Sequence, residues 1–337
     1  MRLLERFWYW SHPLTLLIRP LAWGFCAIAL LRRWLYRAGI LPRQQLGVPV
    51  IVVGNITVGG TGKTPLVIWL TRKLREAGYR PGIVSRGYGG RSRLWPQRVS
   101  ADSDPDQVGD EPVLLARQTR CPIMVAPDRV AAARALLKSH YCDVIVTDDG
   151  LQHYRLARFI EIAVVDGKRR FGNGACLPVG PLREPRSRLA TVDYVVSNGP
   201  ARSSEYAMTL KPGRAINLSD PDVTCALNSF RGSTLHAVAG IGYPERFFAL
   251  LRSAGIAVIE HPFADHHRFS AAELDFGDEL PILMTEKDAV KCQALSGFRC
   301  WYLPVQAVID DAFWQALESR LQTFDRGVTA LPNLTST

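Results

Sequence analysis

The sequence of 337 residues predicts an α/β fold with a parallel-sheet domain, a second, smaller α/β/α domain and an N-terminal membrane-associated helix. Three observations predict it. Strand-like and helix-like runs alternate after residue 45, a glycine-rich turn joins one such strand to a helix, and the first 45 residues are basic and aromatic. A hydrophobic content of 47% and a charged content of 21% indicate a globular protein, long enough for one large or two ordinary domains.

Residues 1–45 have the composition of a membrane interface. They hold seven arginines, one acid and four of the eight tryptophans. The uninterrupted apolar stretch Leu21–Leu31 has eleven residues, whereas a spanning helix needs ~20. A helix lying in the interface is therefore at least as well supported as one that spans, and a buried helix of the soluble domain is the alternative. No small-residue cleavage site follows the stretch, which argues against a signal peptide.

Two further classes of function are disfavoured by composition. The N-terminal arginines are interleaved with aliphatic residues, so a nucleic-acid site is not expected. The seven cysteines are scattered without a C-x-x-C pair, which fits reduced thiols and no zinc framework. No segment indicates a protein partner.

The alternation after residue 45 predicts two α/β units, 46–215 and 216–330. The predicted strands are Val48–Val53, Arg80–Ser85, Ile123–Ala126, Asp143–Thr147, Ile160–Val165, Asp193–Ser197, Leu235–Gly240, Ala257–His261 and Pro281–Thr285. The predicted helices are Leu66–Ala77, Glu111–Arg117, Val130–Ser139, Pro244–Ala254 and Ala271–Phe276.

The glycine-rich turn is typical of a phosphate-binding loop (P-loop), because a β-branched strand precedes it and a helix follows. The predicted nucleotide-binding residues are Thr57, Val58, Gly59, Gly60, Thr61, Gly62, Lys63, Thr64 and Pro65. Glycines let several amides face one anion, Lys63 can reach the β- and γ-phosphates, and the Thr64 hydroxyl can bind Mg²⁺. Thr57 stands where the general pattern has glycine. The alternative interpretation is an ordinary glycine-rich turn before a helix, with no phosphate-binding role.

Paired acids provide candidates for metal binding and proton transfer. Asp148 and Asp149 follow an apolar strand, and such carboxylates lie beside the P-loop and bind or orient the Mg²⁺ shell. His153 follows closely and suits a hydrogen-bonding role. Asp110 and Glu111 open a predicted helix, with Asp110 as the N-cap, and a capping carboxylate could also accept a proton from a substrate hydroxyl.

Other candidates lie at predicted strand-to-helix junctions. Arg86 and Tyr88 belong to a glycine-rich loop that could close on substrate. Arg129 and the Arg183–Glu184 pair could stabilise a transferring phosphoryl group, although arginines there are also commonly salt-bridged. In the second half, Asp265, His266 and His267 favour an acid–base dyad over a metal site, and Thr285–Asp288 could help bind substrate.

Taken together, these motifs resemble the tetraacyldisaccharide 4'-kinase (lipid A 4'-kinase) family. The resemblance covers nearly the whole chain and includes the basic, aromatic N-terminus. It rests on Thr-Val-Gly-Gly-Thr-Gly-Lys-Thr-Pro at 57–65, Ser-Arg-Gly-Tyr at 85–88, Gly-Asp-Glu-Pro at 109–112, Asp-Asp-Gly-Leu-Gln-His at 148–153, Asp-His-His at 265–267 and Thr-Glu-Lys-Asp at 285–288.

The resemblance implies transfer of the γ-phosphate of ATP to the 4'-hydroxyl of a tetraacylated glucosamine disaccharide 1-phosphate, at the cytoplasmic face of a Gram-negative inner membrane. It also implies roles for particular residues. Lys63 and Thr64 bind phosphates and Mg²⁺, Asp148 and Asp149 lie at the metal, and Asp110 is the proposed base. His266 would pair with that base. The remaining cleft positions are Arg86, Tyr88, Glu111, Arg129, His153, Arg183 and Glu184.

Two other functions remain open at this point. The first is a membrane-targeting or partitioning P-loop ATPase that acts as a switch. Such proteins often carry a lysine just before the paired glycines, where this chain has Val58. The second is a membrane-anchored nucleotide-binding protein without turnover. ATP use with and without a lipid acceptor would discriminate between them.

Overall fold

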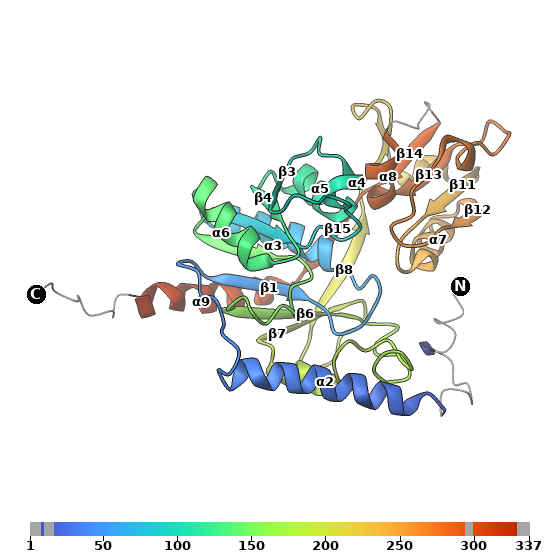
Figure 1. Cartoon of the computed structure of the whole chain (residues 1–337). Helices are drawn as coiled ribbons and strands as arrows, with labels where there is room; N and C mark the ends of the chain where they lie inside the picture. Colours follow the sequence, from blue (N-terminus) through green and yellow to red (C-terminus); the bar gives the residue numbers. More distant parts are fainter. Residues whose placement is uncertain (1–7, 10–16, 294–298, 329–337) are drawn as a thin grey trace, which may run out of the picture.

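The computed structural model describes residues 8–9, 17–293 and 299–328, with side chains as far as Phe324. Two β-sheets organise this part of the chain, and the long helix α2 (Arg19–Arg37) lies beside the larger one (Figure 1). Residues 1–7 and 10–16 of the predicted N-terminal segment 1–45 lie outside the described residues.

The larger sheet has nine strands in the order β15-β8-β7-β6-β1-β5-β2-β4-β3. Seven of them run parallel from β8 to β4, and β15 and β3 pair antiparallel at the two edges. The strands are β1 (Val50–Gly54), β2 (Pro81–Ser85), β3 (Gln97–Val99), β4 (Ile123–Val125), β5 (Val144–Thr147), β6 (Ile160–Asp166), β7 (Tyr194–Asn198), β8 (Tyr206–Pro212) and β15 (Val305–Ile309).

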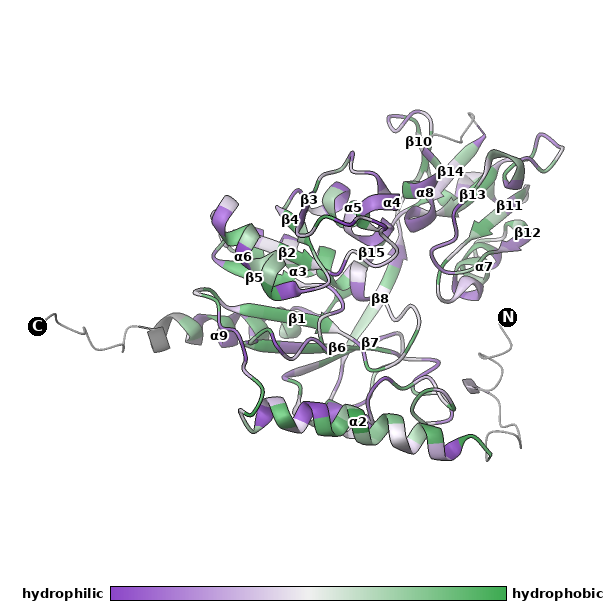
Figure 2. Cartoon of the chain, viewed as in Figure 1, coloured by the Kyte–Doolittle hydropathy of each residue, from purple (hydrophilic) through white to green (hydrophobic). Residues whose placement is uncertain are grey.

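Helices cover both faces of this sheet, so its central strands are apolar on both sides (Figure 2). Side chains alternate along β1: Ile51 and Val53 pack into one core, and Val50 and Val52 pack into the other. The first core is completed by α3 (Lys63–Glu76), α5 (Asp110–Thr119) and α9 (Asp311–Val328), and the second by α6 (Arg129–Ser139). The short helix α4 (Pro105–Val108) precedes α5.

The second sheet has six strands in the order β10-β9-β14-β13-β11-β12, with a parallel core from β14 to β12. Its strands are β9 (Ala215–Asn217), β10 (Thr224–Cys225), β11 (Thr234–Ala239), β12 (Ala257–Pro262), β13 (Ile282–Thr285) and β14 (Cys300–Leu303). Helices α7 (Pro244–Ser253) and α8 (Glu286–Cys292) pack beside it, and α8 also contacts α5 of the larger domain.

The predicted range 216–330 for the second domain is wrong at its C-terminal end. After β14 the chain returns to the larger sheet as β15 and α9. The two crossings between the sheets lie together, because the amide of Gly213 donates to the carbonyl of Pro304 over 2.9 Å. Sequence periodicity reports local structure only, so it could not reveal this return.

Two local predictions also need correction. The helix expected over Ala271–Phe276 is a single 3₁₀ turn, Ala271–Glu273, which Ser270 and Glu273 cap reciprocally; the chain turns away by Gly277, which has a φ of +75°. Asp110 is the first residue of α5 rather than its N-cap, since Gly109 holds the cap position with a φ of +95°. The Asp110 carboxylate is thereby left to face the cleft.

Helix α2 presents one narrow face to the protein. Ala22, Cys26, Ala29, Arg33 and Tyr36 recur at helical spacing and are buried or half-buried, whereas most of the other residues are exposed. Within the described part of the chain, no helix combines the length and the apolar character needed to cross a membrane.

Docking of α9 onto the first core depends on Phe313. Its ring is fully buried and lies 5.0 to 5.6 Å from the rings of Trp69, Tyr194 and Tyr206. Phe313→Ala should lower the free energy of unfolding by about 3–5 kcal/mol through the cavity it leaves. Urea unfolding followed by tryptophan fluorescence measures this. Exposed Gln322→Ala on the same helix is the control, and equal stability of the two variants would contradict the docking.

Candidate active site

The P-loop occupies the turn between β1 and α3, as its sequence predicts. Gly59 and Gly62 have φ values of +105° and +100°, which side chains other than glycine rarely adopt. A Cβ on Gly62 would also lie 2.6 Å from Nδ2 of Asn198. That amide group donates to the Thr61 carbonyl over 3.0 Å, so the end of β7 holds the loop in place.

The loop leaves a row of amides available for an anion. In the part of the chain that the structure describes, the amides of residues 59–63 make no hydrogen bond, and the buried Thr61 Oγ1 has no partner. The amide of Val58 differs, because it donates to the Pro181 carbonyl over 2.8 Å. The Val58 amide therefore anchors the loop to its neighbour, and the amides from Gly59 to Lys63 are the ones left to face an anion.

Lys63 and Thr64 each face one of the paired acids that follow β5. Lys63 Nζ lies 3.5 Å from Oδ1 of Asp149 and donates to Asn55 Oδ1 over 3.3 Å. Thr64 Oγ1 donates to Asp148 Oδ2 over 3.4 Å. The structure thus brings the P-loop lysine and threonine together with both predicted acids.

The two acids differ in electrostatics. Burial, reinforced by the negative charge of Glu111, raises the pKa of Asp148 to about 7. Burial also disfavours the charge of Asp149, but Lys63 and Arg183 outweigh it and hold the Asp149 pKa well below its usual range. Oδ1 of Asp148 is buried without a hydrogen-bond partner among the described residues. A carboxylate oxygen of this kind, beside the Thr64 hydroxyl, fits the hard oxygen donors that Mg²⁺ takes in kinase sites.

Two predicted arginines hold Asp149. Both Asp149 carboxylate oxygens accept from Arg183 Nη1, over 3.2 and 3.0 Å, and its carbonyl accepts from Arg129 Nη2 over 3.3 Å. Asp149 itself has a φ of +52°, which is uncommon outside glycine. Backbone strain of this kind persists where surrounding contacts enforce it, as they do here.

Glu184 and His153 contact residues next to this cluster. Buried Glu184 accepts from Gln152 over 2.8 Å and from the Tyr154 hydroxyl, so it supports the segment after the paired acids. His153 Nε2 lies 3.6 Å from Asp128. Burial and the charge of Arg129 lower the pKa of His153 to about 4, so its imidazole is neutral at pH 7.

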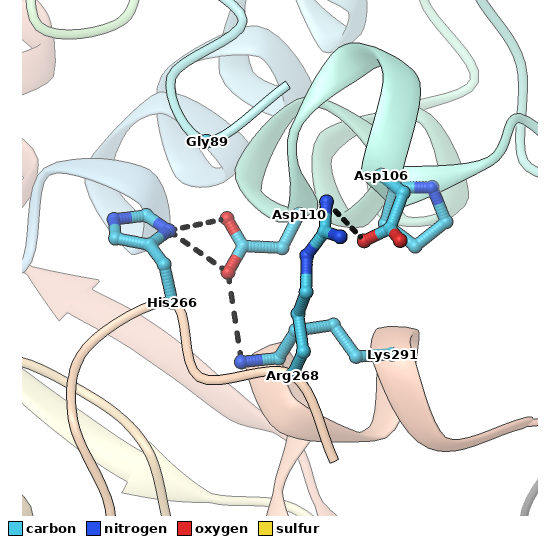
Figure 3. Close-up of a pocket in the computed structure, with 7 residues that line it drawn as sticks. Gly89, Asp106, Asp110, His266, Arg268 and Lys291 are labelled. Atoms are coloured by element: carbon cyan, nitrogen blue, oxygen red, sulfur yellow. Dashed lines mark hydrogen bonds and ion pairs between the residues drawn. The ribbon is translucent and has the colours of Figure 1, made fainter. Parts of the chain in front are cut away.

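A second cluster forms where the two domains meet (Figure 3). Asp110 at the start of α5 is buried, and both its carboxylate oxygens lie 2.9 to 3.0 Å from Nδ1 of His266. His266 Nδ1 must donate, since the carboxylate only accepts when ionised. A pocket beside this pair is lined by Gly89, Pro105, Asp106, Asp110, His266, Arg268 and Lys291.

The surroundings of the pair shift the pKa of both Asp110 and His266. Burial raises the pKa of Asp110, but the positive charge of Lys287 and the hydrogen bond from His266 outweigh it and bring the pKa to about 2. For His266, burial lowers the pKa, and the Asp110 contact more than reverses this. His267 takes a different partner, Glu273 at 3.0 Å, so of the two histidines it is His266 that faces Asp110.

The remaining predicted residues surround the pair. The Tyr88 ring lies 4.9 Å from the His266 ring, and the Arg86 guanidinium lies 6.0 Å from the Tyr88 ring. Glu111 accepts from Lys287 over 2.9 Å. The loop that carries Arg86 and Tyr88 follows β2, whose neighbour β5 ends at the paired acids, so this loop connects the two clusters.

Sequence reasoning missed three residues that the structure places here. Asn55 contacts Lys63, Asn198 supports Thr61, and Lys291 lies 3.7 Å from Asp110. The Lys287–Lys291 spacing of one helical turn was the available signal for the last. A single asparagine at the end of a strand gives no such signal in the sequence.

The left-handed backbone of Gly62 is needed both for the turn and for the contact with Asn198. Gly62→Ala should lower MgATP affinity about tenfold or more, a loss of ~1.4 kcal/mol, because the clash displaces the loop. Gly78→Ala is the matched control, since Gly78 has a φ of +88° but open space around it. Isothermal titration of both variants makes the comparison, and equal affinities would contradict the assignment of the loop.

The comparisons with known proteins agree with this geometry. The model of the family described as tetraacyldisaccharide-1-P 4'-kinase (LpxK) matches residues 14–322. Tetraacyldisaccharide 4'-kinase of Alkalilimnicola ehrlichii is 57% identical over 90% of this chain and 92% of the relative, and that of Nitrosococcus oceani is 52% identical over 95% and 94%. The crystal structure of LpxK from Aquifex aeolicus in complex with ATP is 27% identical, with a TM-score of 0.76 over 91% of this chain and 99% of that one. The chain therefore belongs to the tetraacyldisaccharide 4'-kinase family of ATP-dependent kinases in lipid A biosynthesis.

Proposed function

We propose that the chain transfers the γ-phosphate of ATP to the 4'-hydroxyl of a tetraacylated glucosamine disaccharide 1-phosphate. The observation that carries this proposal is the meeting of a P-loop and a buried Asp110–His266 pair in one site between two domains. Family membership and the ATP-bound relative support the same reaction.

The P-loop supplies the nucleotide site. The amides of residues 59–63, which make no hydrogen bond to the described residues, and the positive end of α3 suit the β- and γ-phosphates. Lys63 adds a positive charge beside the loop. Arg183 and Lys63 both contact the carboxylate of Asp149. Phosphoryl transfer depends chiefly on positioning and charge neutralisation, which is what these groups provide.

Mg²⁺ is the metal that the site fits. Thr64 and Asp148 would hold it, with Asp149 beside them, because they present oxygen donors and one buried carboxylate oxygen lacks a partner among the described residues. When bound, the ion would neutralise charge on the transferring phosphoryl group. Lys63 and Arg183 keep Asp149 ionised, so its carboxylate could contribute negative charge beside the ion.

The Asp110–His266 pair is the proposed acid–base group. Asp110 would orient the acceptor hydroxyl and accept its proton as the new bond to phosphorus forms. His266 holds both carboxylate oxygens and stabilises the charge of the pair. The adjacent pocket, with Arg268 and Tyr88 near it, is the proposed entry for the sugar.

The second domain would also shield the nucleotide from water. Its segment at Gly242 lies directly on the P-loop, since a Cβ on Gly242 would lie 2.6 Å from the amide nitrogen of Gly60. Arg246 of α7 binds Asp166 of the larger domain over 2.5 Å and helps to hold this contact. Such closure favours transfer to a bound acceptor over hydrolysis.

We further propose that α2 places the enzyme at the cytoplasmic face of the bacterial inner membrane. Its outward side exposes Leu21, Trp23, Ile28, Leu31 and Trp34, each more than half accessible. A helix with this arrangement of aromatic, aliphatic and basic residues lies well in a lipid interface. The acylated substrate would then reach the site from the same surface.

Removal of the Lys63 charge should abolish transfer. With γ-labelled ATP, Mg²⁺ and the lipid disaccharide 1-phosphate, Lys63→Ala should label lipid at least about 100-fold more slowly. Lys73→Ala on the same helix is the control, because the ion pairs of Lys73 are with Glu76 and Asp311 near the surface. Normal transfer by Lys63→Ala would refute the assignment of the loop. If the unaltered protein released label only as inorganic phosphate, the result would favour the ATPase switch.

Charges placed on the outward side of α2 should release the protein from lipid. The double variant Trp23→Asp/Ile28→Asp should bind phosphatidylethanolamine–phosphatidylglycerol vesicles at least about tenfold more weakly, because each large apolar side chain buried in lipid contributes roughly 1.5–3 kcal/mol. Leu94→Asp, at an equally exposed apolar position, is the control. Flotation assays measure binding, and unchanged flotation would locate the anchor elsewhere.

A further inference from the structure

Helix α8 directs two lysines at the two acids that open α5. Lys287 Nζ donates to Glu111 Oε1 over 2.9 Å, and Lys291 Nζ lies 3.7 Å from Asp110 Oδ2. The lysines are one helical turn apart, and the acids are adjacent in the chain. Two elements from different domains therefore meet through two parallel ion pairs.

Each lysine is also held from its own domain. Lys287 donates to Asp265 over 3.1 Å, and Lys291 donates to Asp288 over 2.9 Å. Asp288 is fully buried and additionally accepts from the Gly240 amide and the Thr285 hydroxyl. The lysine heads are thus held from their own domain as well as across the interface, which reduces the entropy lost in the cross-domain pairing.

The ion pairs are buried, which strengthens their electrostatic effect. Asp110 is 4% exposed, and the side chains of Lys291 and Lys287 are 8% and 15% exposed. A buried carboxylate without a nearby cation would be strongly destabilised in its ionised form. His266 contacts the same carboxylate through Nδ1, and its imidazole is charged only when protonated, whereas the two lysines add positive charge from α8.

We propose that Lys287 and Lys291 are positioning residues for phosphoryl transfer, acting together as a clamp that fixes Asp110 in its ionised form and orientation when the domains meet. This rests on the proposed role of Asp110 as base. Neither lysine needs to touch the acceptor, since the clamp acts through the carboxylate. Other charged groups facing the cluster are Glu111 on α5, Asp106 before it, and Asp265, His266 and Arg268 on the loop after β12.

The test compares Lys287→Met and Lys291→Met with the matching arginine variants, using initial rates of lipid phosphorylation between pH 5 and 9. Each methionine variant should lower kcat about tenfold, a part of the 10²–10⁴ typical of proton-transfer catalysis, and leave the KM for ATP unchanged. The acid limb of kcat lies below this range in the wild type, where the pKa of Asp110 is about 2, and should rise toward it in the variants, because Asp110 protonates more readily when a neighbouring positive charge is removed. Arginine should restore part of the rate.

Lys138→Met, an exposed position on α6, is the control. A fall in kcat with an unmoved acid limb and no rescue by arginine would overturn the clamp, as would unchanged kcat. If Lys291→Met fails to fold by circular dichroism, Lys287→Met and the arginine variants decide by the same criteria.

Asp110→Asn separates this inference from the function on which it rests. If Asp110→Asn retains normal kcat, the base assignment fails. If it loses kcat while both lysine variants keep theirs, only the clamp fails. Lys291→Met added to Asp110→Asn should lower kcat no further, because the lysine acts through the carboxylate. Additive losses would contradict that route.

Discussion

Buried carboxylates in the cleft, Asp110 and Asp148 above all, constrain the rest of the molecule. A buried carboxylate remains ionised only where cations or hydrogen-bond donors reach it. For Asp110 the cations come from the second domain, through His266, Lys287 and Lys291, and the Glu111 amide of its own helix also donates over 2.8 Å. For Asp148 the nearest donor is Thr64, and burial raises its pKa to about 7, so the carboxylate lacks a full complement of partners among the described residues. The proposed magnesium site follows from that deficit.

The fold explains why the compensating groups lie where they do. In a parallel sheet the carboxyl ends of β1, β5 and β2 reach one edge, so the P-loop, the paired acids and the Arg86 loop meet there. The second domain enters the chain after β8 and leaves it before β15, with the crossings joined at Gly213 and Pro304. An insertion held at both ends keeps α8 opposite α5, so its lysines face the acids.

The sequence predicted most of the strands and the P-loop, because apolar periodicity and glycine patterns are local signals. It also indicated Asp110, His266, Asp148 and Asp149, although the family resemblance rather than periodicity paired the first two. The return of β15 and α9 could not be predicted, since it depends on contacts about 100 residues apart, such as Phe313 with Tyr206. The bond from the Val58 amide to Pro181 could not be predicted for a similar reason, because Pro181 lies in a distant segment.

Helix α2 is joined to the site through polar side chains rather than through apolar packing alone. Buried Arg33 donates to Thr191 Oγ1 over 2.5 Å, and the same oxygen accepts from Arg188, which lies 3.6 Å from Glu184. Glu184 binds Gln152, which also donates to the carbonyl of Asn55 beside the P-loop. Burial, together with the positive charge of Arg188, lowers the pKa of Arg33. The contact between Arg33 and Thr191 places the buried face of α2 against the larger domain and leaves the apolar side of α2 exposed.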